Sequence, residues 1–232
     1  MPTVKGSKRA ALITAVVMGL MMLVSGASAS TNSAVVYLNA TFECGCNRTG
    51  GGAMVGLNVL ITAAHNLVCP THNKSLKYCN FFFGYDGKSY TKEYRGKFFY
   101  GWCSDFSNGY DSRNDIGYVI FNENVGSQTG FFEVGFMDPE DDSWSWDYYN
   151  IYGYSGKNLV VDRAKLSGID SREISWPMSS GFSGTLEGGP VEAGNMVFAI
   201  YTSHSGMTGY GRLITRDIWQ DIRNNGGDFG FD

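Results

Sequence analysis

The sequence predicts an all-β protein built from closed β-barrels, with a single α-helix near the C-terminal end. After residue 30 the chain is a series of short apolar runs, and Gly, Asn, Asp and Ser separate one run from the next. Closed barrels are the expected arrangement because they leave no exposed strand edges. The chain has 232 residues, of which 43% are hydrophobic and 15% aromatic, so it can bury a sizeable core.

The predicted strands are rich in β-branched and aromatic residues, which pack well on a pleated sheet. The clearest are 35–38, 59–62, 117–121, 149–152 and 197–201. Turn-forming stretches such as Asp86-Gly87 and Asn108-Gly109 lie between them.

Helical periodicity is found only close to the C-terminus. Thr215 can cap a helix there, Asp217 lies in its first turn, and Gly226-Gly227 can end it. The side chains that would line its apolar face are Ile218, Trp219 and Ile222.

Residues 1–29 have the pattern of a secretory signal peptide. Lys5, Lys8 and Arg9 precede an apolar run over 10–23, and Ala27-Ser28-Ala29 supplies small residues for cleavage. A membrane anchor is the alternative, but a helix of this length spans only about 21 Å of a hydrocarbon core roughly 30 Å thick. We therefore expect the mature chain to be secreted to the extracellular side, without a membrane association after cleavage.

The charge balance argues against nucleic acid as a partner. The chain has 18 Lys and Arg against 22 Asp and Glu, a net charge of −4. Binding to phosphates requires the opposite balance.

The five cysteines, Cys44, Cys46, Cys69, Cys79 and Cys103, all lie in the first half of the mature chain. In an oxidising compartment they predict two disulfides and one remaining thiol, with a pairing that the sequence leaves open. The alternative is a zinc site made from Cys44, Cys46, Cys69, His72 and Cys79. Because no CxxC pair is present, we expect disulfides and no metal.

Three short stretches carry residues suited to nucleophilic catalysis. The strand at 59–62 is followed closely by His65, Asp115 directly precedes the strand at 117–121, and Ser183 lies between Gly181 and Gly184. An imidazole can accept the proton of a serine hydroxyl, and a carboxylate can orient that imidazole. Gly181 allows the backbone to turn so that the Gly181 and Ser183 amides can face a developing oxyanion.

In this order, Thr62-Ala-Ala-His65, Asn114-Asp-Ile116 and Gly181-Phe-Ser-Gly184 resemble the motifs of chymotrypsin-fold serine peptidases. The bacterial glutamyl-endopeptidase-like branch is the most similar. Stretches 52–56, 151–156 and 211–215 support the resemblance, which spans roughly residues 33–225.

The resemblance implies two six-stranded antiparallel barrels with the active site in the cleft between them. The first lobe, residues 30–125, would supply His65 and Asp115, and the second, residues 126–232, would supply Ser183 and the terminal helix. Such an enzyme needs no cofactor and no catalytic metal. We expect a monomeric serine endopeptidase acting on protein or peptide substrates.

The sequence departs from the family after the serine, where Gly-Gly-Pro or Gly-Ser-Pro is usual. Here Thr185-Leu186-Glu187 separates Ser183-Gly184 from Gly188-Gly189-Pro190. One register keeps Ser183 as nucleophile with a three-residue insertion behind it. The other register places Glu187 in the nucleophile position and makes the protein an inactive homologue that binds ligands. We favour Ser183 because Gly181 also supplies the flexibility that the oxyanion loop needs.

Substrate specificity is the second departure. The glutamate-selective branch has a histidine on the strand that lines the pocket, and Tyr201 stands there in this sequence. Thr202, His204 and Arg212 complete the predicted substrate-binding set. His204 or Arg212 would favour an acidic substrate side chain.

Overall fold

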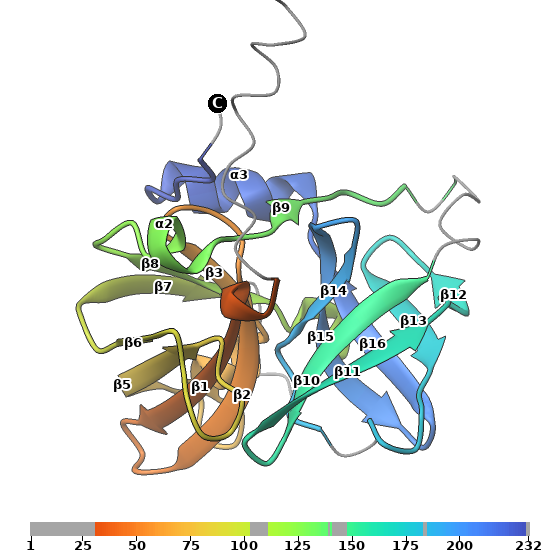
Figure 1. Ribbon diagram of the computed structural model, residues 1–232, viewed down its shortest axis with the longest axis horizontal. Coiled ribbons are helices and arrows are strands. Elements are labelled where there is room, and N and C mark those ends of the chain that lie inside the picture. Colours follow the sequence, from red (N-terminus) through yellow and green to blue (C-terminus); the bar gives the residue numbers. More distant parts are fainter. Residues whose placement is uncertain (1–30, 103–110, 139, 141–147, 183–184, 231–232) are drawn as a thin grey trace, which may run out of the picture.

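Two β-sheets and a C-terminal helix make up the described part of the chain, which in this computed structural model comprises residues 31–102, 111–138, 140, 148–182 and 185–230. The sheets lie side by side, the first formed by the N-terminal half of the chain and the second by the C-terminal half (Figure 1). The prediction of an all-β fold with a terminal helix is confirmed.

The first sheet has the strand order β4-β5-β1-β2-β3-β8-β7, with β6 paired to β5. Its strands are β1 (Val35–Phe42), β2 (Asn47–Met54), β3 (Val59–Thr62), β4 (Val68–Cys69), β5 (Lys74–Phe83), β6 (Lys92–Tyr94), β7 (Phe98–Trp102) and β8 (Gly117–Phe121). All of these pairings are antiparallel.

The second sheet has the order β11-β10-β14-β15-β16-β13-β12, and β9 runs parallel to β15. Its strands are β9 (Glu133–Val134), β10 (Tyr149–Ser155), β11 (Asn158–Ala164), β12 (Gly168–Ile169), β13 (Glu173–Pro177), β14 (Pro190–Ala193), β15 (Met196–Ser205) and β16 (Thr208–Leu213).

Each sheet therefore has eight strands within the described ranges, where the resemblance implied six. Two strands in each are only two or three residues long: β4 and β6 in the first sheet, β9 and β12 in the second. The other six strands of each sheet match the expected barrels.

The helices are short except for the last. They are the 3-10 helices η2 (Thr31–Ala34), η3 (Ala64–Asn66) and η5 (Ser112–Asn114), and the α-helices α2 (Gly126–Thr129) and α3 (Arg216–Asn224). None of the helices in the described ranges is long and apolar enough to span a bilayer.

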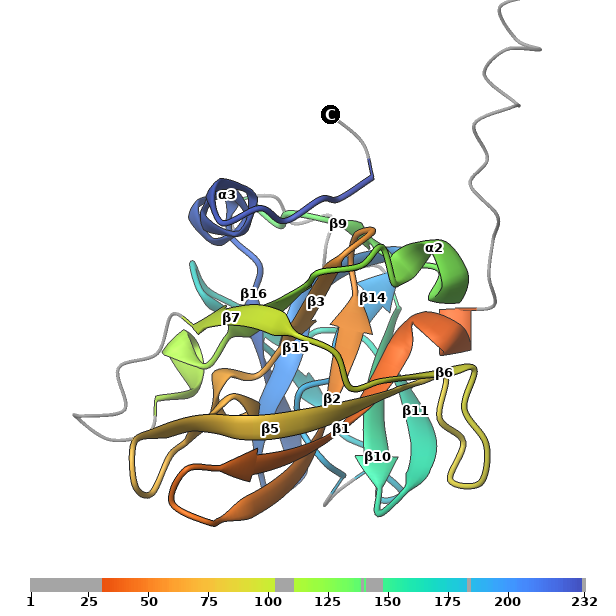
Figure 2. The ribbon, with the colours of Figure 1, turned by 90° about the vertical axis from the view of Figure 1, so that its left-hand side faces the viewer.

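The terminal helix α3 begins after Thr215, as predicted, and buries Ile218 and Ile222. Although α3 follows the last strand of the second sheet, both side chains belong to the core of the first. Figure 2 shows α3 beside β9, at the end of the molecule away from the β1–β2 turn.

Strand β2 is one of the strands that hydrophobic patterning did not predict, because its sequence, Asn-Arg-Thr-Gly-Gly-Gly-Ala-Met, is polar and rich in glycine. Its glycines allow close approach of other backbone segments. A Cβ on Gly51 would lie 2.8 Å from the backbone nitrogen of Gly189, and one on Gly50 would collide with the Asn66 side chain. β2 is thus where the two sheets meet.

The predicted pair of disulfides is not present. Cys44, Cys46, Cys69 and Cys79 are described, and all four are unbonded. Cys103 lies outside the described residues, and two disulfides would require at least one bond among the other four. Burial raises the pKa of the Cys79 thiol, which keeps that thiol protonated.

Candidate active site

His65 and Asp115 are brought together by the pairing of β3 with β8. Thr62, the last residue of β3, is the partner of Gly117, the first residue of β8. Because the strands are antiparallel, the residue following one strand and the residue preceding the other lie at the same sheet edge. Ala63 and Ala64 are fully buried, and they carry the chain tightly from β3 into η3, where His65 lies.

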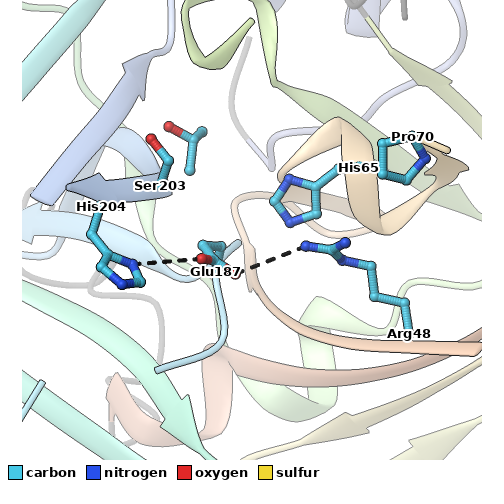
Figure 3. Close-up of a pocket in the computed structure, with 7 residues that line it drawn as sticks. Arg48, His65, Pro70, Glu187, Ser203 and His204 are labelled. Carbon is cyan, nitrogen blue, oxygen red and sulfur yellow. Dashed lines mark ion pairs between the residues drawn. The ribbon is translucent and has the colours of Figure 1, made fainter. Parts of the chain in front are cut away.

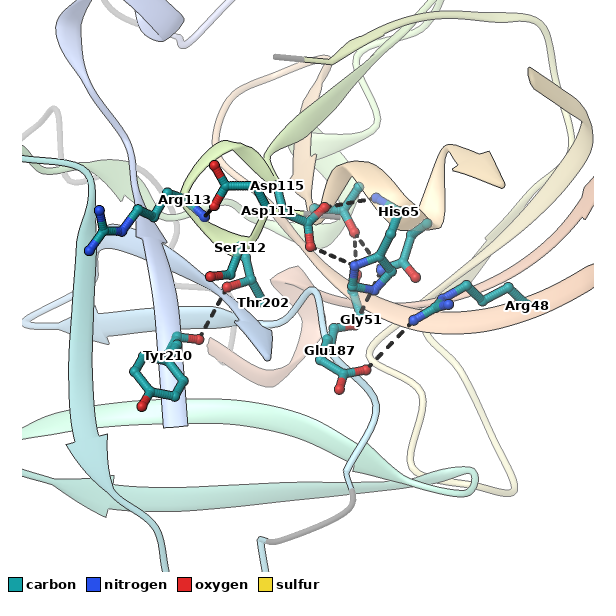
Figure 4. A network of polar contacts seen from close by, with 12 residues as sticks. Arg48, Gly51, His65, Asp111, Ser112, Arg113, Asp115, Glu187, Thr202 and Tyr210 are labelled. Carbon is teal, nitrogen blue, oxygen red and sulfur yellow. Dashed lines mark hydrogen bonds and ion pairs between the residues drawn. The ribbon is translucent and has the colours of Figure 1, made fainter. Parts of the chain in front are cut away.

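The two side chains are held by a double contact (Figure 4). The His65 ring nitrogen Nδ1 lies 2.6 Å from Asp115 Oδ2, and the His65 backbone N–H donates to Asp115 Oδ1 over 2.9 Å. Both side chains are buried. With Nδ1–H directed at the carboxylate, the ring presents the lone pair of Nε2, the atom that a general base uses.

A cavity of about 300 Å³ opens beside His65. Both sheets contribute to its lining, which consists of Arg48, His65, Pro70, Glu187, Thr202, Ser203 and His204 (Figure 3). Arg48 belongs to β2, Pro70 follows β4, and residues 202–204 belong to β15. The cavity therefore lies at the junction of the two sheets.

Glu187 is the single carboxylate among the lining residues. Its Oε2 lies 3.9 Å from Arg48 Nη2 and its Oε1 lies 3.8 Å from His204 Nδ1. Figure 3 shows Glu187 between these two groups, with His65 on the Arg48 side. The side chains of Arg48 and His204 are 36% and 30% exposed, so each ion pair with Glu187 contributes at most about 1 kcal/mol to stability.

The backbone of Glu187 is held more firmly than its side chain. Its carbonyl oxygen accepts hydrogen bonds from the backbone N–H of Gly51 over 2.7 Å and from Asn66 Nδ2 over 3.2 Å. The next N–H, that of Gly188, donates to the Tyr201 carbonyl over 2.7 Å. These bonds connect β2, η3 and β15 at one point.

The glycines after Glu187 are required by this packing. Gly188 has φ +104°, a conformation that L side chains rarely adopt. A Cβ on Gly188 would collide with the Gly51 carbonyl, and one on Gly189 would collide with the Tyr152 carbonyl. The Gly-Gly-Pro stretch thereby determines where the preceding residue, Glu187, enters the cavity.

Ser183, the predicted nucleophile and one of the two predicted oxyanion donors, lies outside the described residues. Gly181, the other predicted donor, is exposed, does not line the cavity, and has open space around its Cβ position. Phe182 is fully buried, and its ring centroid lies 5.4 Å from that of Tyr201.

The predicted substrate-binding residues of β15 divide into two groups. Thr202 and His204 line the cavity. Tyr201 is not among the lining residues; it is fully buried against Trp176 and Phe182, with its hydroxyl 3.1 Å from His204 Nδ1. Burial raises the pKa of the Tyr201 hydroxyl, so this hydroxyl stays neutral. It can therefore donate a hydrogen bond to His204 or accept one from it.

Arg212 does not line the cavity. It is buried on β16, where its Nη1 donates to the carbonyl of Leu213 over 2.6 Å and to that of Arg172 over 3.3 Å. Its guanidinium ties together backbone segments of the second sheet. The arginine that reaches the cavity is Arg48.

Sequence reasoning missed three of the lining residues, Arg48, Pro70 and Ser203. Arg48 lies in the polar, glycine-rich stretch of β2, where nothing in the local pattern distinguishes it from a solvent-facing cation. Pro70 lies one residue after Cys69, in a segment whose cysteine and histidine indicate disulfide or metal chemistry rather than a substrate cavity. Arg48 and Pro70 reach the cavity because the fold brings β2 and the end of β4 beside Glu187 and residues 202–204, more than 100 residues later in the chain.

Comparison with known proteins agrees with this architecture. No protein-family profile and no curated protein sequence matches the chain. A Glu endopeptidase structure superposes with a TM-score of 0.69 at 14% identity, covering 87% of this chain and 94% of that one. The thermostable serine protease AL20, from an extremophilic microorganism, has a TM-score of 0.67 at 16% identity, with 84% and 97% covered.

A third similar structure is described as an inactivated protease paralogue from the scabies mite. It has a TM-score of 0.60 at 14% identity and covers 87% of this chain and 98% of that one. Proteins with this fold thus include both proteases and an inactivated relative. At these identities the comparisons establish architecture, and this chain has the two-barrel fold of the chymotrypsin-like serine proteases.

Proposed function

We propose that the chain is a secreted serine endopeptidase in which Ser183 is the nucleophile, His65 the general base and Asp115 the residue that orients His65. The observation that carries this proposal is the His65–Asp115 contact of 2.6 Å beside a cavity at the junction of the two sheets. Ser183 and the Gly181 and Ser183 amides, as oxyanion donors, come from the sequence motif.

The cost of burying this pair supports a functional role for it. Asp115 is fully buried and His65 is 2% exposed. Removing a carboxylate and an imidazole from water carries a desolvation penalty that their attraction offsets only in part, and apolar side chains fill such a site at lower cost. The pair is therefore better explained by proton transfer than by stability.

The proposed reaction proceeds in two stages. Ser183 Oγ attacks the carbonyl carbon of the scissile bond, and its proton passes to His65 Nε2. His65 then protonates the leaving amine as the C–N bond breaks, which leaves an acyl group on Ser183. Water releases the acyl group by the same route in reverse. These steps require Ser183 Oγ to come within about 3 Å of Nε2.

The cavity chemistry supports a preference for acidic substrate side chains. Arg48 and His204 line the cavity, and they already pair with the Glu187 carboxylate at 3.9 and 3.8 Å. A substrate carboxylate could take the place of Glu187 between them. Mapping the cleavage sites in a digested peptide library tests this, and cleavage without enrichment of Asp or Glu would reject the preference.

A second candidate function is ligand binding without catalysis. The position of Glu187 favours it, because this residue shares the His65 cavity and directly precedes Gly188-Gly189-Pro190. A carboxylate there would not form the acyl intermediate. In this case the cavity would hold a peptide through Arg48, His204 and the exposed ends of the neighbouring strands.

Labelling with a serine-directed phosphonate separates the two candidates. If Ser183 is the nucleophile, the wild-type protein is labelled, Ser183→Ala abolishes labelling and casein cleavage, and the matched control Ser180→Ala retains both. If Glu187 holds the nucleophile position, the wild-type protein is not labelled, whereas Glu187→Ser places a hydroxyl beside His65 and gains labelling. Equal labelling of the wild-type protein and of the Ser183→Ala variant would reject the first proposal.

A further inference from the structure

Three cysteines and a histidine converge at the end of the first sheet, outside the His65 cavity. Cys44 and Cys46 lie in the turn between β1 and β2, Cys69 is the last residue of β4, and His72 lies in the connection between β4 and β5. We propose that these four side chains bind one zinc ion as a structural Cys₃His site.

The interatomic distances fit tetrahedral coordination. The four ligand atoms all lie within 4.8 Å of one another, and His72 Nδ1 lies 3.5 Å from both Cys46 Sγ and Cys69 Sγ. A tetrahedral zinc with Zn–S of about 2.3 Å and Zn–N of about 2.0 Å separates a sulfur from a nitrogen ligand by about 3.5 Å. The His72 ring thus lies where a zinc ligand would lie, with Nδ1 facing the sulfurs.

The backbone places the donors without help from a metal. Gly45, between the first two cysteines, has φ +84° and donates its N–H to the Phe42 carbonyl over 2.9 Å. The Phe42 N–H in turn donates to the Cys46 carbonyl over 2.9 Å. This tight turn explains a Cys-Gly-Cys spacing in place of CxxC, since it directs both cysteines to the same ion.

The second pair of donors comes from a similarly constrained turn. Asn73 has φ +49°, and its N–H donates to the Cys69 carbonyl over 2.8 Å. A hydrogen bond of 3.0 Å from the Glu43 N–H to the Ser75 carbonyl joins this turn to the first one. Main-chain hydrogen bonds within each turn, and one between the two turns, therefore hold the four ligands together.

The donor set selects the metal. Three thiolates and one imidazole favour zinc over calcium or magnesium, which prefer oxygen ligands. Disulfide formation is the competing chemistry, but three cysteines can form only one disulfide among themselves. One disulfide would leave the third thiol and His72 next to each other with no ion to bind in common.

The site would hold the rim of the His65 cavity in place. Arg48 lies two residues after Cys46, and Pro70 lies one residue after Cys69; both line that cavity. A metal ion that links the two turns fixes these two segments relative to each other. This role is the same whether the cavity catalyses hydrolysis or binds ligands.

Metal analysis of the reduced full-length protein tests the proposal. We expect about one zinc per chain, and loss of that zinc in Cys46→Ser and in His72→Ala. The matched controls Cys79→Ala and His204→Ala change a cysteine and a histidine outside the cluster, and both should keep the zinc. Cobalt(II) added to the zinc-free protein should produce thiolate-to-cobalt charge-transfer absorption together with the intense visible bands of tetrahedral cobalt.

The cobalt spectrum of the unaltered chain keeps the test valid even if a cysteine variant fails to fold. Wild-type protein that binds neither zinc nor cobalt when its thiols are reduced would overturn the proposal. So would a disulfide between two of Cys44, Cys46 and Cys69 in protein produced with zinc present, detected by mass spectrometry. Zinc retention by folded His72→Ala at the wild-type affinity would remove His72 from the site.

Discussion

At the scale of single residues, the contact between His65 and Asp115 is the part of the site with the most defined chemistry. Asp115 accepts two hydrogen bonds from one residue, through the ring and through the backbone N–H of His65. This arrangement fixes both the tautomer and the orientation of the imidazole. An amide at position 115 would retain the shape of the carboxylate and lose its charge.

For Asp115→Asn we therefore expect kcat for peptide hydrolysis to fall by a factor on the order of 10⁴, with a much smaller change in KM. Steady-state kinetics on a peptide substrate measure this. Asp111→Asn is the matched control: Asp111 is an exposed carboxylate four residues away that caps η5, and its variant should keep its activity. Near-normal kcat in Asp115→Asn would show that the pair does not take part in catalysis.

At the scale of elements, the approach of β2 to the Gly188-Gly189 segment determines the geometry of the cavity. The Gly51 N–H donates to the Glu187 carbonyl, and a Cβ on Gly189 would collide with the Tyr152 carbonyl on β10. The Glu187 and Tyr152 carbonyls are backbone groups, which cannot move aside as the end of a flexible side chain can. The junction therefore tolerates no side chain at these positions.

We expect Gly189→Ala to lower the free energy of unfolding by about 2 to 4 kcal/mol, or to prevent folding. Urea unfolding followed by fluorescence measures the difference. Gly181→Ala is the control for this stability measurement, since its Cβ meets nothing within 4 Å and its backbone is not in the left-handed region. A wild-type free energy of unfolding in Gly189→Ala would mean that the Gly189 backbone is not packed against the Tyr152 carbonyl on β10.

At the scale of the whole molecule, α3 connects the two halves of the fold. It follows β16 of the second sheet, yet Ile218 and Ile222 pack in the core of the first. The Tyr118 hydroxyl on β8 donates to Asp221 Oδ2 over 2.8 Å and accepts from Asn225 Nδ2 over 3.1 Å. The C-terminal segment thus stabilises the sheet that carries His65 and Asp115.

Truncating the apolar face of α3 should destabilise the first sheet. Ile222 is fully buried, and Ile222→Ala is expected to lower the free energy of unfolding by about 2 to 5 kcal/mol. Gln220→Ala, on the exposed face of the same helix, should change it by less than about 0.5 kcal/mol. Hydrogen exchange of the β3 and β8 amides shows whether the first sheet loses stability in Ile222→Ala. Unchanged protection of these amides would contradict a link between α3 and the first sheet.

The predictability of this protein differs between elements. Strands β3 and β8 coincide with the predicted ranges 59–62 and 117–121, because their continuous β-branched and aromatic runs reflect burial on both faces. The helix beginning after Thr215 was also predictable from its apolar face; Thr215 is at the N-cap position, although its side chain makes no capping hydrogen bond. Strand β2 was not predictable, since its glycines serve contacts with Gly189 and Asn66 that no local pattern encodes.

The candidate site shows the same division. The motifs around His65 and Asp115 were visible because each lies at the end of a strongly patterned strand. Arg212 was predicted near the pocket and instead binds backbone carbonyls on β16, while Arg48 reaches the cavity from β2. Which of two arginines faces the cavity depends on sheet register and twist rather than on neighbouring residues.

The amino-acid sequence alone determined the all-β class, the terminal helix and the residues that could form a proton-transfer pair, because these depend on side-chain periodicity and chemistry within a few residues. Only the tertiary structure decided that Glu187 enters the His65 cavity and that Cys44, Cys46, Cys69 and His72 form one cluster. Both results bring together segments from different parts of the chain. Their relative positions are set by strand pairing and by backbone contacts at glycine, which residue-by-residue patterns do not record.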